Sequence, residues 1–152
     1  MAHSGDKPLG VSVVIPVYSG VDTLPQLLVE LASLTSPQVT PKGRKFSITE
    51  VLLVWDRGPG RSDEIIRQLK VQYPFVKPIW LSRNFGQHAA TLAGMTSASG
   101  DWIVTMDEDG QQDPAYIGQM IDLAYEEHAQ LIYADPTNNA PHGALRNAAS
   151  KT

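Results

Sequence analysis

Cysteine is absent from the 152-residue sequence. This absence excludes a disulfide framework, a thiolate metal site and a cysteine nucleophile. The sequence also lacks an apolar run of the roughly 18–20 residues that a membrane-spanning helix needs. Its start, MAHSGDKPLG, lacks the apolar segment of a secretion signal. We therefore expect a cytoplasmic protein that is not exported through a signal peptide.

Charged residues are sparse and do not strongly favour one sign. They make up 18% of the chain, and the formal net charge of -4 gives no reason to expect nucleic acid as a partner. Apolar residues make up 42%, and a chain of this length can bury a sizeable core within one domain. The composition indicates a soluble globular protein.

The sequence does contain a repeated alternation of short apolar runs and amphipathic helical patterns. Runs rich in β-branched residues and bounded by turn signals are typical of strands buried on both faces. The predicted strands are Val11–Ile15, stopped by Pro16, then Val51–Trp55, Val76–Leu81, Trp102–Met106 and the start of a fifth at Leu131–Tyr133. This alternation predicts an α/β fold with a doubly wound, mostly parallel sheet and helices on both faces.

The predicted helices have recognisable starts and stops. Leucines at helical spacing continue to Leu34 in the first helix, while Thr35–Ile48 reads as a long exposed loop. The predicted helices begin at Asp22 as N-cap, at Ser62, at Gln87 and at the Asp113–Pro114 pair, and the third runs to Ala98 with Gly100 as its C′ glycine. In such folds ligands bind beyond the carboxyl ends of the strands, so neighbouring first and fourth strands would place their ends in one crevice.

Three acidic residues, Asp107, Glu108 and Asp109, follow the fourth strand directly. Neighbouring carboxylates repel one another and lose hydration near a core, so the arrangement is costly unless a cation shares the site. Asp107 and Asp109 are one residue apart and can face one cation while Glu108 points elsewhere, and Gln111 can add a neutral oxygen. All-oxygen ligands of this kind suit Mg²⁺ or Mn²⁺. The other reading is a solvated turn before a helix N-terminus, where acids are favourable anyway.

Two further readings of the acidic turn fit less well. A calcium loop with Gly110 at its sixth position would have Tyr116 where a glutamate is needed. A phosphatase of the haloacid dehalogenase type would use Asp107 as its nucleophile, but it needs a lysine and further acids well downstream, and the chain after Glu127 offers only Asp135 and Lys151.

Three segments taken together carry a resemblance to a known family. VVIPVY at Val13–Tyr18, LSRNFGQHAATLAG at Leu81–Gly94 and SGDWIVTMDEDGQQDP at Ser99–Pro114 are similar to the family 2 glycosyltransferases. The branch that they resemble most transfers a sugar to polyprenyl phosphate, as dolichyl-phosphate mannose synthases and bacterial undecaprenyl-phosphate glycosyltransferases do. The resemblance implies a GT-A (Rossmann-like) fold, inverting transfer from a UDP-, GDP- or dTDP-linked sugar, Mg²⁺ or Mn²⁺ as cofactor, and cell-wall or polysaccharide biosynthesis.

The resemblance also assigns residues by position. Asp107 and Asp109 match the D-x-D motif as catalytic and metal-binding residues, with Gln111 as a further metal ligand. The residues expected to bind the nucleotide sugar are Pro16, Val17, Tyr18, Asp56, Arg83, Asn84, Gly86, Asp107 and Glu108.

Two positions depart from the family pattern. The family usually has Asn-Glu where this chain has Ser19-Gly20, and paired acids where Trp55 precedes Asp56. The altered WDRGPG loop leaves open whether Trp55 stacks on a ligand or is simply packed. It also keeps a second hypothesis open, a non-catalytic, degenerate glycosyltransferase-fold domain for binding or assembly.

The resemblance suggests how the chain is organised. We expect a flexible N-terminus at residues 1–10, a nucleotide-sugar-binding domain at 11–135, and at 136–152 a loop and the start of a further segment. Relatives have a C-terminal half that completes the acceptor site, so the polyprenyl phosphate would be bound through segments missing here, at the cytoplasmic face of a membrane. An exposed sheet edge would also favour association into a homo-oligomer.

Overall fold

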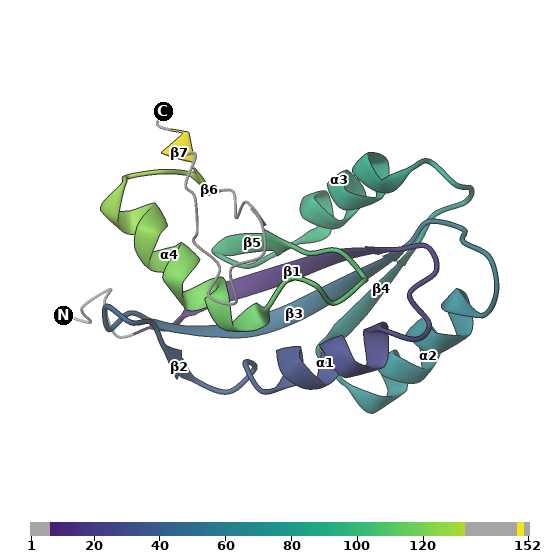
Figure 1. Cartoon of the computed structure of the whole chain (residues 1–152), viewed down its shortest axis with the longest axis horizontal. Coiled ribbons are helices and arrows are strands. Elements are labelled where there is room, and N and C mark those ends of the chain that lie inside the picture. Colours follow the sequence, from purple (N-terminus) through teal and green to yellow (C-terminus); the bar gives the residue numbers. More distant parts are fainter. Residues whose placement is uncertain (1–6, 133–148, 151–152) are drawn as a thin grey trace.

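The computed structural model describes residues 7–132 and 149–150 (Figure 1). The strands are β1 (Leu9–Val17), β2 (Gln38–Val39), β3 (Lys45–Trp55), β4 (Val76–Trp80), β5 (Trp102–Thr105), β6 (Leu131–Ile132) and β7 (Ala149–Ser150). The helices are α1 (Leu24–Ala32), α2 (Ser62–Gln72), α3 (Gln87–Ser97), the short 3₁₀ helix η1 (Pro114–Tyr116) and α4 (Ile117–Glu126). The predicted strands and helices are therefore present, and β1 and β3 extend beyond their predicted bounds.

The main sheet is mostly parallel, as predicted. β1 lies between β3 and β5 and pairs with both in parallel, while β4 pairs in parallel with the second half of β3. The expectation that the first and fourth predicted strands are neighbours is thus confirmed, because they correspond to β1 and β5. Both strands end on the same edge of the sheet, which is where ligands bind in folds of this kind.

Helices cover both faces of the sheet. Alternate residues of its strands point to opposite sides, and both sets are apolar, so each face has a core to bury. On one face, Val13 and Ile15 of β1 belong to a core that also contains leucines of α1, Ile66 of α2 and Ile121 of α4. On the other face, Val14 belongs to a smaller core with Ala90 of α3. Figure 1 shows α3 on one side of the sheet and α1 and α2 on the other.

Pro16 lies inside β1 rather than after it. The last hydrogen bond between β1 and β5 runs from the amide of Met106 to the carbonyl of Val14, at 2.9 Å. The next donor on this side of β1 would be the amide of residue 16, and proline has none. Pro16 therefore ends the pairing with β5, while β1 continues beside β3 to Val17.

The prediction of a long exposed loop at Thr35–Ile48 is wrong. The segment contains β2 and the start of β3, which pair antiparallel, with Phe46 and Ile48 buried. This hairpin is tied to α4, since the buried carboxylate of Asp122 accepts hydrogen bonds from the hydroxyl of Thr40 at 2.6 Å and from Arg44 Nη1 at 2.8 Å. The sequence signal was the alternation of apolar and polar residues from Phe46 onward.

Two predicted end signals act differently in the structure, and α1 ends at Ala32, before Leu34. Thr23, not the exposed Asp22, occupies the N-cap position of α1. Gly100 does not act as a C′ glycine, because α3 ends at an extended Ala98. Glycine is needed at position 100 for another reason: a Cβ there would lie 2.7 Å from Ser12 Oγ and 2.8 Å from the carbonyl oxygen of Gly10.

The predicted fifth strand begins at Leu131, as expected, but it pairs antiparallel with β7 in a separate two-stranded sheet. Tyr133, most of the predicted segment at 136–152 and residues 1–6 of the predicted N-terminus lie outside the described residues. Within the described ranges, no helix has both the length and the apolar character that crossing a bilayer requires.

Candidate donor-binding site

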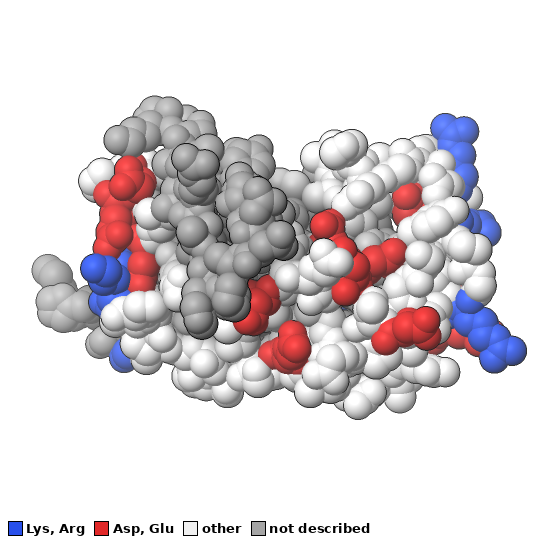
Figure 2. Space-filling model, in the orientation of Figure 1, with Lys and Arg blue, Asp and Glu red and all other residues white. Residues whose placement is uncertain are grey.

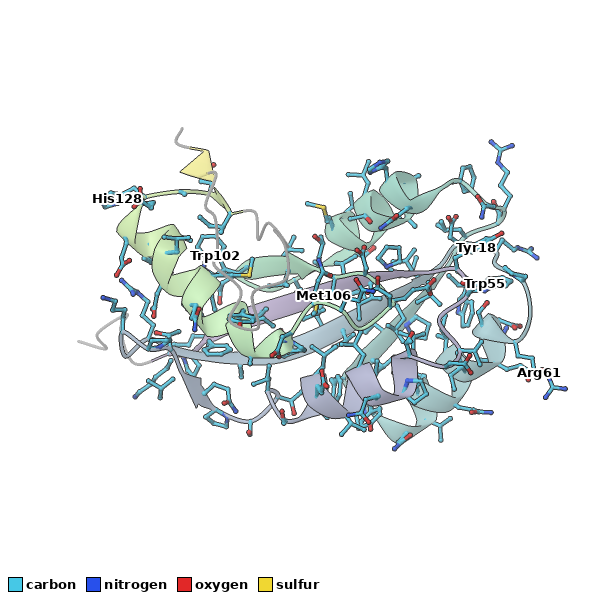
Figure 3. The ribbon with its side chains drawn as sticks, in the orientation of Figure 1. Tyr18, Trp55, Arg61, Trp102, Met106 and His128 are labelled. Carbon is cyan, nitrogen blue, oxygen red and sulfur yellow. The ribbon has the colours of Figure 1, made fainter. Side chains whose placement is uncertain are left out.

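A pocket of about 490 Å³ opens at the carboxyl ends of β1, β3 and β5. This volume lies within the range of roughly 300–1,000 Å³ that is usual for small-molecule sites. Its lining consists of Pro16, Val17, Tyr18, Asp56, Asn84, Gly86, Gln87, Asp107, Glu108 and Asp109. Figure 3 shows Tyr18 and Trp55 at this end of the sheet, whereas Trp102 and His128 lie at the opposite end.

The charges in the lining all have one sign. The acidic residues Asp56, Asp107, Glu108 and Asp109 line the pocket, and no lysine or arginine of the described residues joins them. Figure 2 shows acidic side chains gathered in the middle of this face below α3, with basic side chains toward the two ends of the molecule. An anionic ligand would be repelled from such a pocket unless a cation accompanied it.

Asp107 and Asp109 are exposed, and each has one oxygen engaged by a neutral donor. Asp107 Oδ1 accepts from Gln87 Nε2 at 2.8 Å, and Asp109 Oδ1 accepts from the amide of Gln111 at 3.0 Å. Within the described residues no hydrogen bond or ion pair joins the second oxygen of either side chain. These oxygens suit a hard divalent cation.

Glu108 points away from its two neighbours, as expected. Its carboxylate accepts hydrogen bonds from the amides of Tyr18 and Ser19 at 2.9 Å and from the amide of Gly20 at 2.8 Å. The hydroxyl of Thr23 donates to the backbone oxygen of Glu108. Glu108 therefore joins the loop after β5 to the loop after β1.

Asp56 holds together the loops that follow β3 and β4. The side chain is buried, and its Oδ1 accepts from the amide of Phe85 at 2.8 Å, while its backbone oxygen accepts from Asn84 Nδ2 at 2.9 Å. Among the described residues, Oδ2 of Asp56 has no hydrogen-bond partner. Every wholly buried side-chain nitrogen or oxygen atom of those residues has one, so Oδ2 must be at least partly accessible. Asp56 thus presents an acceptor to the pocket.

The N-terminus of α3 borders the pocket. Gly86 is the residue before the helix and has φ of 95°, a conformation that side chains other than glycine rarely adopt. Gln87, the first helical residue, lines the pocket and orients Asp107 through its amide nitrogen. The sequence analysis did not assign Gln87 to the site. Its position directly after the SRNFG segment could have indicated that it belongs there.

Trp55 is packed within the protein. Its Nε1 donates to Ser62 Oγ at 3.0 Å, and its ring meets the edge of Trp80 at a centroid distance of 5.8 Å. Arg57 lies over the ring at 5.2 Å. At the position of the first paired acid, this chain therefore has a tryptophan that packs against α2 and β4. Of Trp55 and Asp56, only Asp56 lines the pocket.

Two predicted site residues lie outside the lining. Arg83 is exposed and its guanidinium stacks over the ring of Phe85 at 4.6 Å. Gln111 is also exposed. Its backbone amide donates to Asp109, and its side chain makes no hydrogen bond to the described residues. The side chain of its neighbour Gln112 does contact the acidic turn: Gln112 Oε1 accepts a hydrogen bond from the backbone amide of Asp107 at 2.7 Å.

A two-carboxylate donor set fits a divalent ion that also binds substrate oxygens. Asp107 and Asp109 supply hard anionic ligands at the pocket, and the described residues contain no cluster of three or more His, Cys, Asp or Glu that would enclose a metal. Mg²⁺ and Mn²⁺ are commonly held by one or two carboxylates with phosphate oxygens in the remaining positions.

Comparisons of sequence agree on one family. A model described as Glycosyl transferase family 2 matches residues 12–150. An undecaprenyl-phosphate 4-deoxy-4-formamido-L-arabinose transferase of Klebsiella pneumoniae (strain 342) is 35% identical over 145 residues, which cover 93% of this chain and 41% of the relative. The protein of the same name in Pseudomonas aeruginosa (strain LESB58) is 38% identical over 115 residues, covering 75% of this chain and 32% of the relative. The chain thus spans less than half the length of these relatives.

Solved structures share the fold. Residues 1–349 of TarS from S. aureus align with a TM-score of 0.62 at 21% identity, covering 87% of this chain and 37% of that one. The mannosyltransferase PcManGT from Pyrobaculum calidifontis, in complex with GDP-Man and Mn²⁺, aligns with a TM-score of 0.56 at 18% identity, covering 69% of this chain and 29% of that one. The expected GT-A fold is confirmed.

Proposed function

The chain belongs to glycosyltransferase family 2, and on this basis we propose that its pocket binds a nucleotide-diphosphate sugar together with Mg²⁺ or Mn²⁺ for an inverting transfer. The observation that carries the proposal is the pocket's charge: carboxylates line it and no basic side chain among the described residues joins them. A diphosphate can enter such a site only with a cation that offsets the repulsion.

Asp107 and Asp109 would hold the metal, with Gln111 as a further ligand. The free oxygens of the two carboxylates border the pocket, while their other oxygens are oriented by Gln87 and by the amide of Gln111. When bound, the metal would offset the negative charge that develops on the leaving diphosphate.

Lining residues at the ends of β1, β3 and β4 would bind the nucleotide and the diphosphate. Pro16, Val17 and Tyr18 would line the nucleoside, and Asp56 would accept a hydrogen bond from an N–H of the base. Asn84 and Gly86 lie at the N-terminus of α3, where backbone amides and the helix dipole favour phosphate. Arg83 would approach the donor from the rim of the pocket.

We propose a polyprenyl phosphate as the acceptor. The support is that the relatives from K. pneumoniae and P. aeruginosa are named undecaprenyl-phosphate sugar transferases. A phosphate is largely ionised near neutral pH, so such a nucleophile has less need of a general base than a sugar hydroxyl.

Calorimetry tests the proposal. UDP-, GDP- and dTDP-sugars are titrated with and without Mn²⁺ into the unaltered chain, Asp109→Asn and the matched variant Asp63→Asn on α2, a residue that does not line the pocket. We expect Mn²⁺-dependent binding that Asp109→Asn abolishes and Asp63→Asn retains. If no nucleotide binds to the folded, unaltered chain, the alternative of a non-catalytic, degenerate domain is favoured.

A further inference from the structure

Glu108 completes an anion site built from the backbone of another loop. The amides of Tyr18, Ser19 and Gly20 are successive donors, and all three converge on its carboxylate at 2.8–2.9 Å. Successive backbone N–H groups that form such a concavity bind anions in many proteins. Here the anion is a side chain from a loop about 90 positions later in the sequence, so the contact fixes the loops relative to each other.

The fit between the loops depends on glycine at position 20. A Cβ added at Gly20 would lie 2.6 Å from Glu108 Oε2 and 3.0 Å from Glu108 Cβ. Thr23 holds the backbone oxygen of Glu108 at the same time. Glu108 is therefore anchored through both its side chain and its main chain, and only a residue without a side chain at position 20 leaves room for it.

The anchoring has a consequence for the neighbouring acids. Three successive carboxylates repel one another. The amide donors offset the charge of Glu108 and turn it toward the loop after β1. Asp107 and Asp109, on either side of this fixed point, keep an oxygen free at the pocket.

We propose that Glu108 is a positioning residue: by occupying the amides of residues 18–20, it holds the turn in the conformation in which Asp107 and Asp109 share one divalent cation. This inference rests on the proposed function, because it assumes that these two aspartates bind the metal. Glu108 itself then binds neither the metal nor the donor, and Gly20 is its structural counterpart.

The test combines metal affinity with a local spectroscopic signal. Mn²⁺ affinity is measured by calorimetry for the unaltered chain, Glu108→Ala, Glu108→Gln and the exposed control Glu30→Gln on α1. Loss of an outer-shell contact typically lowers metal affinity about 10- to 100-fold, and we expect this loss in both Glu108 variants and not in the control. The amide proton resonances of Tyr18, Ser19 and Gly20 should move upfield in the Glu108 variants alone.

A double substitution separates the proposed contact from general damage. Gly20→Ala should weaken Mn²⁺ binding because the added methyl group displaces the carboxylate, and it should add little in the Glu108→Ala background. Additive losses would overturn the proposal, as would folded Glu108 variants whose Mn²⁺ affinity or residue 18–20 amide shifts match the unaltered chain. Failure of the unaltered chain itself to bind Mn²⁺ would instead identify the proposed function as wrong, and this inference would fall with it.

Discussion

Gly58 lies against the backbone carbonyl of Tyr18 so closely that a Cβ at position 58 would overlap the carbonyl oxygen. The loop after β1 is thus confined on one side by the loop after β3 and on the other by Glu108 from the loop after β5. The three loops follow the strand order β3, β1, β5. The rim of the pocket therefore depends on close backbone packing.

Gly58→Ala should destabilise the protein, because the overlap is with backbone that cannot rotate away. We expect a loss of about 2–3 kcal/mol in the free energy of unfolding, the upper range for overpacking. Gly118→Ala in α4 is the control, since its Cβ would meet Phe46 at an ordinary 3.4 Å and alanine favours a helix. Urea denaturation measures both variants, and equal stability of the two would contradict the packing described.

Asp122→Asn should reveal a pH-dependent contribution to stability. Burial alone raises the pKa of Asp122, but hydrogen bonds from Thr40, Arg44 and the Lys42 amide, with the charge of Arg44, outweigh it and lower the pKa below its ordinary value of 3.8. Because the folded pKa is the lower one, the stabilisation is present above pH 3.8 and is lost as the pH falls through the folded value.

At neutral pH we expect the asparagine variant to lose about 1–3 kcal/mol of unfolding free energy, since it disrupts charge-assisted hydrogen bonds made by a buried carboxylate. The difference from the unaltered chain should shrink in acid below the ordinary carboxyl pKa. Asp22→Asn, at an exposed position, is the control and should lose little stability at neutral pH. A stability difference for Asp122→Asn that is independent of pH would rule out this account of the α4–hairpin contact.

Trp55→Phe separates packing from ligand stacking. The variant keeps an aromatic ring against Trp80 but loses the hydrogen bond to Ser62, so we expect a stability loss of about 1 kcal/mol. Nucleotide-sugar affinity in the presence of Mn²⁺ should not change, because Trp55 does not line the pocket. A large loss of affinity in a folded variant would show that the indole contacts the nucleotide after all.

Gln87→Ala should weaken metal binding without altering the fold. The variant removes the donor that orients Asp107 Oδ1, and the loss of such a partner typically costs roughly 10-fold or more in metal affinity. Gln68→Ala, exposed on α2, is the matched control. Calorimetry with Mn²⁺ measures both, and equal affinities would remove Gln87 from the site.

The arrangement of the main sheet could be predicted from the sequence because its strands are buried on both faces. Such strands appear as continuous apolar runs, as in Val11–Ile15 and Val51–Trp55, and these runs mark β1 and the second half of β3. The first half of β3 is only half-buried and alternates, with Phe46 and Ile48 inside and the polar residues Lys45, Ser47 and Thr49 less buried. This weaker signal, next to two prolines, reads as a loop in the sequence.

The site could be predicted only in part, because sequence spacing does not show which residues of different loops contact one another. Asp107 and Asp109 were found from their place after a strand, and the pocket does bring them together with Tyr18 and Asp56. The contact between Gly20 and Glu108 could not be found in this way. It joins a glycine that departs from the family pattern to an acid on another loop, and neither residue identifies the other in the sequence.

The most direct test is the effect of substoichiometric Mn²⁺ on the amide resonances of the chain, since this paramagnetic ion broadens signals from nearby nuclei. We expect residues 107–110 to lose intensity first, together with residues 86–87, which border the same pocket, and we expect the double variant Asp107→Asn with Asp109→Asn to abolish the effect. Broadening centred on another part of the chain, or unchanged in the double variant, would contradict a metal site between these aspartates.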